Sequence, residues 1–292
     1  MQKHTVAVLG GDKRMDFATR ELIRLGYDVR EWGRREGDSA AAFAKKAAEW
    51  LSDVDVLMLP LPTSTDGTHL STPLLAGGEG VRMETLFCAA PDKLWLVGRF
   101  GETLQRRARK ENVHYIDYFE SEILQLKNAL PTAEGAIEIA MRELPVVLDG
   151  TKVAVIGYGR IGEVLSAKLW ALGAGVTVYA RRPSACTRAE LAGHSSKPLF
   201  EGRDLLFDKD TRVIFNTVPS RLLGRSTLQT LPEDCLLIDL ASAPGGIDMQ
   251  AAEALGLRAI WATALPGKCA PESAGVILGE VAHSILTDAT AF

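Results

Sequence analysis

The sequence has no excess of basic residues, and this absence excludes a broad class of partner. The 292 residues include 33 Lys and Arg against 37 Asp and Glu, which gives a formal charge of −4. A general nucleic-acid binder normally carries a strong basic excess on one face. We therefore expect no nucleic-acid partner.

Long apolar runs are also missing. No uninterrupted hydrophobic stretch approaches the roughly 20 residues that a membrane-spanning helix needs. The N-terminus passes from MQKH directly into a short apolar strand, without the pattern of a signal peptide. The sequence therefore predicts a cytoplasmic protein that does not associate with membranes.

Cysteine and histidine are few and scattered. The four cysteines form no CxxC pair, and no two of the five histidines have the i, i+4 spacing of metal ligands on a helix. We expect buried or incidental thiols, with neither a disulfide framework nor a metal site.

The chain instead has a regular alternation of short β-branched runs and helical segments, which is typical of parallel α/β proteins. Hydrophobic residues make up 47% of the chain, so a packed core is expected. In the first half, strands are predicted at 5–11, 28–33, 54–62, 93–100 and 113–118, with helices at 16–26, 39–51 and 103–112. The alternation restarts at 151–173 and continues with strands at 175–180, 211–218, 235–241 and 257–265.

This restart predicts an α/β fold of two Rossmann-like domains with parallel sheets joined by hinge helices. The predicted domains are 1–120 on the substrate side, 121–150 as hinge helices, 151–270 as the cofactor-binding domain, and 271–292 as a C-terminal helix that packs back on the N-terminal domain. The helical segment 120–144 contains Pro131, which lacks an amide donor. We therefore expect two helices that meet at NALPT, with Thr132 as a possible N-cap.

The stretch GYGRIG has the spacing of a dinucleotide-binding turn. Gly157, Gly159 and Gly162 follow a strand and open an amphipathic helix, which is the context that this weak motif requires. The first glycine allows a tight turn, the second lets the backbone approach a pyrophosphate, and the third lets the helix pack on the strand. The helix N-terminus then faces the phosphates. The predicted cofactor contacts in this turn are Gly157, Tyr158, Gly159, Arg160, Ile161 and Gly162.

The next strand ends in VYARRPS, where a dinucleotide site usually carries an acidic residue. An NAD-preferring site places Asp or Glu near Ala180 to bind the ribose 2′-hydroxyl. Arg181 and Arg182 would instead bind a 2′-phosphate through charge-assisted hydrogen bonds, and Ser184 would add a hydroxyl. The alternative is a pair of solvated surface arginines. The sequence favours NADP(H).

Polar corners follow several other strands. The corner at the end of the strand predicted at 211–218 predicts contacts to the nicotinamide ribose or to substrate, with an ordinary proline turn as the alternative. Its members are Asn216, Thr217, Val218 and Pro219 on the cofactor side and Ser220 as a catalytic candidate. In the first domain, a Gly-Gly-Asp turn with Arg14 and the PTST cluster could hold a small carboxylate, or could face solvent. The predicted substrate contacts are Asp12, Arg14, Thr63, Ser64, Thr65, Lys268 and Ser273.

The two-domain layout resembles that of the 2-hydroxy acid dehydrogenases, but their chemistry is not supported. Those enzymes need an arginine just after the fourth strand of the cofactor domain and a histidine acid-base near its end. The corresponding segments here read LASAPGG and ATALPGKCAPES, which contain neither residue. Simple ketone reduction is therefore disfavoured.

Seven motifs in one order resemble the A subunit of bacterial dipicolinate synthase over essentially the whole chain. They are VLGGDKR, LPLPTST, NALPTAEGAI, GYGRIG, NTVPS, LIDLASAPGGID and LPGKCAPESAG. The glycine motif occurs in many dinucleotide-binding families, whereas PTAEGAI, DLASxPGG and LPGxxAPxSAG in succession are fairly specific to this one. The resemblance implies an NADP-linked enzyme of spore formation that makes pyridine-2,6-dicarboxylate from a dihydrodipicolinate-level intermediate of the lysine pathway. It also implies a flavoprotein-like B subunit and a place in the mother-cell cytoplasm.

The residues fit such chemistry. Aromatisation supplies driving force, so orientation of a small dicarboxylate against the nicotinamide would contribute most. Glu134 is a conceivable proton acceptor or a plain helix-start residue, and Thr132 and Ser220 complete the catalytic candidates. We expect a homo-oligomer within a heteromeric complex. Two alternatives are a methylenetetrahydrofolate dehydrogenase-like enzyme, whose Tyr-x-x-x-Lys pattern is missing from 1–120, and a non-catalytic nucleotide-binding regulatory subunit.

Overall fold

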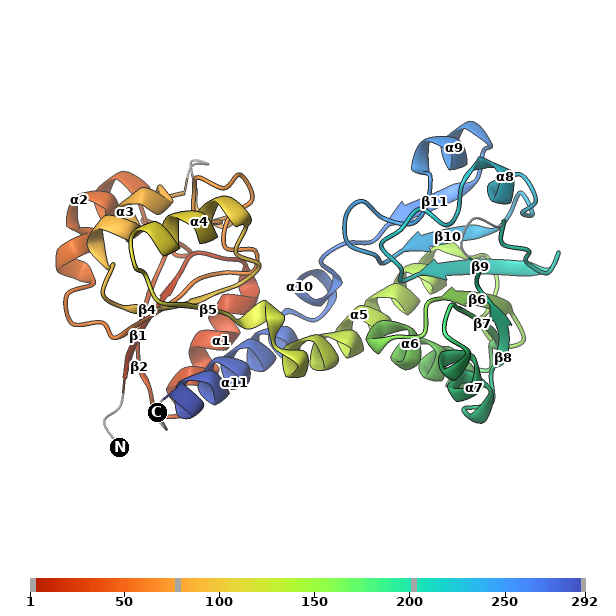
Figure 1. The fold of residues 1–292 in the computed structure, drawn as a ribbon, viewed down its shortest axis with the longest axis horizontal. Helices are drawn as coiled ribbons and strands as arrows, with labels where there is room; N and C mark the ends of the chain where they lie inside the picture. The colour runs from red at the N-terminus through yellow and green to blue at the C-terminus, as the bar shows by residue number, and fades with distance from the viewer. Residues whose placement is uncertain (1–3, 77–79, 201–203, 290–292) are drawn as a thin grey trace. The chain divides into compact units, whose positions relative to one another are not determined.

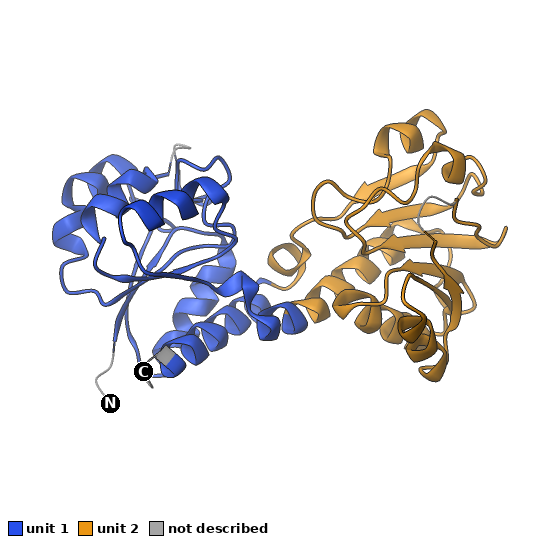
Figure 2. Ribbon diagram, in the orientation of Figure 1, with its two compact units in different colours: residues 1–127, 271–292 blue, residues 128–270 orange. Residues whose placement is uncertain are grey.

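The computed structural model describes residues 4–76, 80–200 and 204–289, and it divides the chain into two compact units. Unit 1 comprises residues 1–127 and 271–292, and unit 2 comprises residues 128–270 (Figure 2). The C-terminal segment therefore clusters with the N-terminal one, and its last three residues lie outside the described part. In that part, no helix is both long and apolar enough to cross a membrane.

Unit 1 is built on a five-stranded parallel sheet with the order β2-β1-β3-β4-β5 (Figure 1). This is the order of flavodoxin-like folds, in which the chain reverses its direction of winding between β1 and β3. The strands are β1 (Thr5–Leu9), β2 (Asp28–Trp32), β3 (Val56–Met58), β4 (Leu94–Val97) and β5 (Tyr115–Asp117). The helices between them are α1 (Lys13–Arg24), α2 (Ala40–Trp50), α3 (Met83–Ala89) and α4 (Glu102–Lys110).

Alternating strand residues build two cores in unit 1, one on each face of the sheet. Ala7 and Leu9 pack with side chains of α2, α3 and α4, whereas Val6 and Val8 pack with α1 and α11 (Pro271–Ala289). This alternation follows from the two-residue period of a strand. The helix α11 lies close to α1, because a Cβ at Gly275 would overlap the Arg14 carbonyl oxygen.

Unit 2 contains a six-stranded parallel sheet with the order β11-β10-β9-β6-β7-β8. Counted from its first strand, this is the 3-2-1-4-5-6 order of dinucleotide-binding Rossmann folds. The strands are β6 (Lys152–Ile156), β7 (Gly175–Ala180), β8 (Ser195–Pro198), β9 (Thr211–Asn216), β10 (Leu236–Asp239) and β11 (Arg258–Trp261). The helices are α6 (Arg160–Ala171), α7 (Pro183–Leu191), α8 (Arg225–Leu228), α9 (Met249–Ala254) and α10 (Leu265–Cys269). The predicted class of two parallel-sheet, Rossmann-like α/β domains is confirmed.

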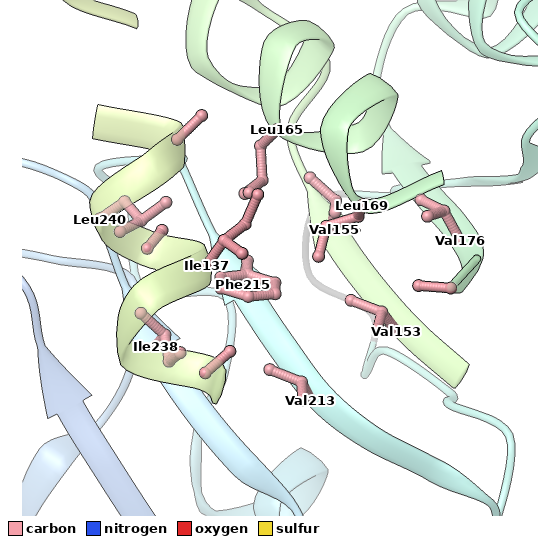
Figure 3. Close-up of a cluster of buried hydrophobic side chains, with 14 of the residues drawn as sticks. Ile137, Val153, Val155, Leu165, Leu169, Val176, Val213, Phe215, Ile238 and Leu240 are labelled. Atoms are coloured by element: carbon pink, nitrogen blue, oxygen red, sulfur yellow. The ribbon is translucent and has the colours of Figure 1, made fainter. Parts of the chain in front are cut away.

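One core of unit 2 joins the sheet to α6 and to the C-terminal half of α5 (Glu122–Glu143). Figure 3 shows Phe215 of β9 beside Ile137 of α5, with Leu165 of α6 and valines of β6 in the same core. Phe215 and Leu165 are fully buried. Each such side chain contributes about 1.5–3 kcal/mol relative to an exposed position. This packing fixes the strand ends that carry the glycine turn.

The prediction of two hinge helices that meet at Pro131 is wrong, because α5 runs through the proline without a break. Thr132 is not an N-cap, since its hydroxyl donates to the Asn128 carbonyl oxygen at 2.7 Å. An interior proline costs about 3 kcal/mol. Burial along α5 offsets this cost, with Leu124 fully buried in a unit 1 core and Ala133 fully buried in a unit 2 core.

Candidate functional site

The glycine turn of unit 2 lies where the sheet changes its direction of winding, between β6 and β9. Gly157 has a φ of 94°, and its amide donates to the Tyr179 carbonyl oxygen at 2.8 Å. A Cβ at Gly157 would overlap the Thr217 hydroxyl, and a Cβ at Gly162 would overlap the Gly157 carbonyl oxygen. The backbone of this turn is therefore packed as closely as a dinucleotide-binding turn requires.

Gly159 differs from its two neighbours in the motif, because the space around it is open. It is the N-cap of α6, with no side-chain hydrogen bond, and no atom of a described residue, its two chain neighbours aside, lies within 4 Å of where its Cβ would be. Among the described residues, the N-cap supplies no side chain to the first amides of α6, and the space beside Gly159 is open. Such a helix N-terminus binds phosphate groups through its amides and its dipole. The residues present fit a pyrophosphate.

The two arginines of VYARRPS occupy the turn between β7 and α7. Ala180 at the end of β7 is 3% exposed, whereas Arg181, Arg182 and Ser184 are all exposed. Pro183 begins α7, with Arg182 at the N-cap position. The segment 178–184 itself contains no acidic residue that would repel a 2′-phosphate. The predicted preference for NADP(H) over NAD(H) stays a prediction.

Tyr158 is held between α6 and α7 by one arginine. Arg188 donates to the Tyr158 carbonyl oxygen at 3.3 Å, and its guanidinium carbon lies 5.9 Å from the centre of the tyrosine ring. The same guanidinium donates to Glu163 in the first turn of α6, at 2.6 Å. The arginine therefore links the start of α6 to α7 beside the glycine turn.

His194 lies on the other side of Tyr158, with the two ring centres 6.3 Å apart in an edge-to-face arrangement. It is 5% exposed, and neither ring nitrogen has a hydrogen-bond partner among the described residues. Burial lowers the pKa of His194 below its ordinary value, which is about 6.5. The folded protein thus disfavours the protonated imidazole that the unfolded chain accepts.

This burial predicts that unit 2 loses stability in mild acid. Below about pH 6.5 the unfolded chain binds more protons at His194 than the folded chain, so the free energy of unfolding falls as pH drops through the lowered pKa. Urea unfolding at pH 7 and pH 5 should show this loss, and His194→Leu should reduce it. His114→Leu at an exposed site is the control. An identical pH dependence in wild type and His194→Leu would contradict the prediction.

The polar corner after β9 is held in place by hydrogen bonds of a buried side chain, that of Asn216. Asn216 is fully buried, and its Nδ2 donates to the Val218 carbonyl oxygen at 2.9 Å and to Asp239 Oδ1 at 2.8 Å. Thr217 donates to the Ile156 carbonyl oxygen at 2.9 Å. Asn216 therefore shapes the corner by its internal hydrogen bonds. Pro219 and Ser220 are exposed, and Thr217 and Val218 are half-buried.

In unit 1, the structure brings Asp12 and Arg14 together. Arg14 is 9% exposed and donates from Nε and Nη2 to the Asp12 carboxylate at 2.9 Å each, and from Nη2 to the Leu61 carbonyl oxygen at 2.6 Å. Asp12 also accepts from the Arg14 amide as the N-cap of α1. Leu61 follows β3, so this cluster lies beside the point where the unit 1 sheet changes direction. The guanidinium is largely engaged by protein groups.

Two hydroxyls of the PTST cluster, those of Thr63 and Ser64, have different partners. Thr63 is fully buried, donates to the Pro60 carbonyl oxygen at 3.1 Å and accepts from the Gly98 amide at 2.9 Å. Ser64 donates to Asp66 Oδ1 at 3.1 Å, and Thr65 is exposed. Thr63 therefore ties the loop after β3 to the end of β4, and Ser64 orders the loop itself.

The remaining candidates are dispersed. Glu134 is exposed on α5 and accepts from Lys168 at 2.9 Å, while Lys268 on α10 and Ser273 on α11 are exposed. No contact between described residues joins Glu134 or Thr132 to Ser220. Their catalytic and substrate-binding roles stay predictions.

Sequence reasoning missed the residue that holds the cofactor-side corner in place. Asp239 is 1% exposed, and besides Asn216 it accepts from the amides of Ala241, Gly246 and Ile247 at 2.7–3.1 Å. The motif LIDLASAPGGID contained the signal, because an acidic residue that ends an apolar strand before a Pro-Gly-Gly turn can only be buried with several donors.

Comparisons with known proteins agree with the motifs. Residues 5–119 match the family described as the N-terminal domain of the dipicolinate synthase A subunit. The A subunit of dipicolinate synthase from Bacillus subtilis (strain 168) is 29% identical over 286 residues, which cover 97% of this chain and 96% of the relative. The resemblance to the A subunit of dipicolinate synthase is confirmed.

Solved structures extend this similarity to the whole fold. The A subunit of dipicolinate synthase from Bacillus subtilis has a TM-score of 0.84 and 28% identity, covering 100% of this chain and 98% of the other. The A subunit from Bacillus halodurans gives 0.82 and 26%, covering 97% of each chain. At 13% identity, D-lactate dehydrogenase from Escherichia coli shares the fold alone, with a TM-score of 0.60 over 98% of this chain and 97% of the other.

Proposed function

We propose that this chain, which is similar to the dipicolinate synthase A subunit, is an NADP-dependent oxidoreductase that oxidises a dihydrodipicolinate-level intermediate to pyridine-2,6-dicarboxylate. The observation that carries the proposal is the open glycine turn of unit 2, followed by two arginines where an NAD site has an acidic residue. The turn supports a dinucleotide, and the arginines support NADP(H). The substrate rests on the resemblance.

The chain's own residues would bind and orient the cofactor. The amides at the start of α6 would bind the pyrophosphate across Gly159, and Arg181 with Arg182 would bind the 2′-phosphate. Thr217 and Pro219 would border the nicotinamide ribose, on a corner that Asn216 and Asp239 hold from inside. When bound, NADP⁺ supplies a hydride acceptor.

The proposed reaction balances without a further oxidant. The dihydropyridine ring loses a hydride to NADP⁺ and a proton to a base, and the product is aromatic. The remaining demands are two cationic groups for the carboxylates, a fixed ring orientation and a proton acceptor. Glu134 is the catalytic candidate that carries a carboxylate. To accept the proton from the substrate, it would have to break its ion pair with Lys168.

The relatives are named as one lettered component of a synthase, the A subunit, and this name supports the existence of a partner. We propose that this partner is a flavoprotein-like B subunit of dipicolinate synthase and that the chain forms a homo-oligomer within the complex. The same resemblance supports a role in sporulation, in the mother-cell cytoplasm.

The proposal is tested by NADPH formation from dihydrodipicolinate, measured with the purified chain alone and with the B subunit. We expect NADPH to accumulate in proportion to the aromatic product. If neither preparation changes the redox state of the nicotinamide, the oxidoreductase proposal fails. A regulatory protein would bind the dinucleotide but leave it unchanged.

The arginine pair predicts a specific change in cofactor choice. In a variant with Arg181→Ala and Arg182→Ala, NADP⁺ affinity should fall by roughly a hundredfold, because each lost charge-assisted hydrogen bond costs about 1.5–3 kcal/mol. NAD⁺ affinity should change by less than about threefold, since NAD⁺ has no 2′-phosphate. Titration of both dinucleotides measures the two constants. Equal losses for both would show that the arginines do not read the 2′-phosphate.

A further inference from the structure

Unit 1 contains a cavity of about 370 Å³ that no predicted site residue lines. It opens between the loop after β3 and the starts of α3 and α4, and its volume lies in the range of about 300–1,000 Å³ that is usual for small-molecule sites. Its walls include His69, Arg82, Met83, Glu84, Leu104 and Arg107. Ligands of open parallel sheets bind beyond the carboxyl ends of the strands, and this loop and α4 follow β3 and β4.

Backbone pairing places His69 and Arg82 side by side on the cavity wall. His69 and Arg82 form an antiparallel bridge, although they belong to different segments of the chain. The pairing continues on both sides, with the Leu70 amide donating to the Val81 carbonyl oxygen at 2.9 Å and the Met83 amide to the Thr68 carbonyl oxygen at 2.8 Å. The backbone positions of His69 and Arg82 are therefore fixed relative to each other, and both side chains belong to the same wall of the cavity.

The Arg82 side chain has no hydrogen bond or ion pair with any residue in the described part of the chain. Its side chain is exposed at the N-cap position of α3. An arginine on a cavity wall can bind a carboxylate through two parallel hydrogen bonds. Arg82 can thus reach a ligand without breaking a contact to a described residue.

The guanidinium of Arg107 is oriented by its contacts with Glu111 and Phe87. Its Nε donates to Glu111 at 2.8 Å, and its guanidinium carbon lies 4.8 Å from the centre of the Phe87 ring. Its Nη2 is 3.6 Å from Glu84, which is too long for a hydrogen bond. Because the Glu84 side chain is 61% exposed, a ligand carboxylate can replace it at little cost.

His69 is held by an anchored carboxylate. Asp66 accepts from the amides of Thr68 and His69 at 2.8 Å each, and from Ser64. The backbone amide and the side chain of His69, followed by the Thr68 amide, hold the pKa of Asp66 well below its usual range. The Asp66 carboxylate lies 2.8 Å from His69 Nδ1 and so holds the imidazole in place on the cavity wall.

The bottom of the cavity is apolar, since Met83 is 1% and Leu104 is 4% exposed. We propose that this cavity binds a planar aromatic dicarboxylate, with Arg82 and Arg107 on its carboxylates, the ring against Met83 and Leu104, and the imidazole of His69 on the adjoining wall. The inference rests on the proposed function for the identity of the ligand. It assigns the substrate-side contacts to residues outside the Arg14 and PTST clusters.

Calorimetric titration of the full chain with pyridine-2,6-dicarboxylate, in metal-free buffer, tests the assignment. Arg82→Gln should weaken binding at least tenfold, because a hydrogen bond to a charged group is lost. The matched control is Arg106→Gln, which removes the same charge from the exposed face of α4, and it should change binding by less than twofold. Pyridine-2-carboxylate, with one carboxylate, should bind the wild-type chain more weakly.

The outcomes separate this inference from the proposed function. No saturable binding, or equal effects of the two substitutions, would overturn the cavity assignment. NADPH formation with a KM that Arg82→Gln leaves unchanged would also overturn it, while the proposed reaction would stand. If dicarboxylate binding depends on Arg82 but no NADPH forms, the assignment of the ligand to this cavity is supported and the proposed reaction is contradicted.

Discussion

Gly159→Ala should abolish measurable dinucleotide binding while leaving the fold intact. The backbone at Gly159 has φ −105° and ψ −158°, which alanine adopts without strain. Apart from the two chain neighbours, no atom of a described residue lies within 4 Å of the added methyl group, so unit 2 should keep its unfolding temperature. The methyl group would occupy the space through which the backbone approaches the pyrophosphate. We expect a loss in affinity of at least a hundredfold, or about 2.7 kcal/mol.

Gly162→Ala is the informative contrast at the same turn. There the added methyl group overlaps the Gly157 carbonyl oxygen, which is backbone and cannot move aside cheaply. Overpacking of this kind costs about 1–3 kcal/mol. Gly162→Ala should therefore lower both the unfolding temperature and the affinity for the dinucleotide.

Thermal unfolding and NADP⁺ titration of the two variants, side by side, distinguish a ligand site from a merely structural turn. If Gly159→Ala binds NADP⁺ like the wild-type chain, the open face of the turn is not a dinucleotide site. If instead it unfolds at a lower temperature, the methyl group meets protein and the comparison with Gly162 loses its basis.

Local patterns predicted the fold well where they were undisturbed by tertiary contacts. Strand β7 has the predicted bounds, 175–180, because its β-branched run is closed by glycine and by two arginines. The edge strand β8 has the sequence SSKP and no apolar alternation, so nothing in the sequence indicated it. Pro131 indicated a helix break, but burial along α5 outweighed the local cost.

The candidate site could be predicted from the sequence only where the residue type determines the backbone conformation. Glycines reveal the turn of unit 2 because no other residue fits positions such as Gly157. By contrast, residue type does not reveal the direction of a side chain, and the Thr63 hydroxyl and the Asn216 amide turn inward. The cavity of unit 1 depends on the bridge between His69 and Arg82, which joins separate segments and has no local signature.

Asp239→Asn should be among the most damaging single substitutions in unit 2. Oδ1 accepts from the Asn216 side chain and the Ala241 amide, and Oδ2 accepts from the amides of Gly246 and Ile247. An asparagine has one oxygen, so in either orientation its NH₂ group faces two donors. Each buried donor without an acceptor costs about 1–3 kcal/mol. We expect the free energy of unfolding to fall by about 2–6 kcal/mol.

The same substitution should weaken NADP⁺ binding, because Asp239 holds the corner beside the glycine turn. Asp208→Asn is the matched control: its carboxylate is 49% exposed and pairs with Lys197, so the loss should stay below about 1 kcal/mol. Urea unfolding measures both variants, and NADP⁺ titration below the unfolding transition measures the corner. Similar small losses for the two variants would mean that the loop after β10 rearranges to satisfy its donors. If Asp239→Asn destabilises the protein but leaves its NADP⁺ affinity unchanged, the corner that Asp239 holds does not contribute to cofactor binding.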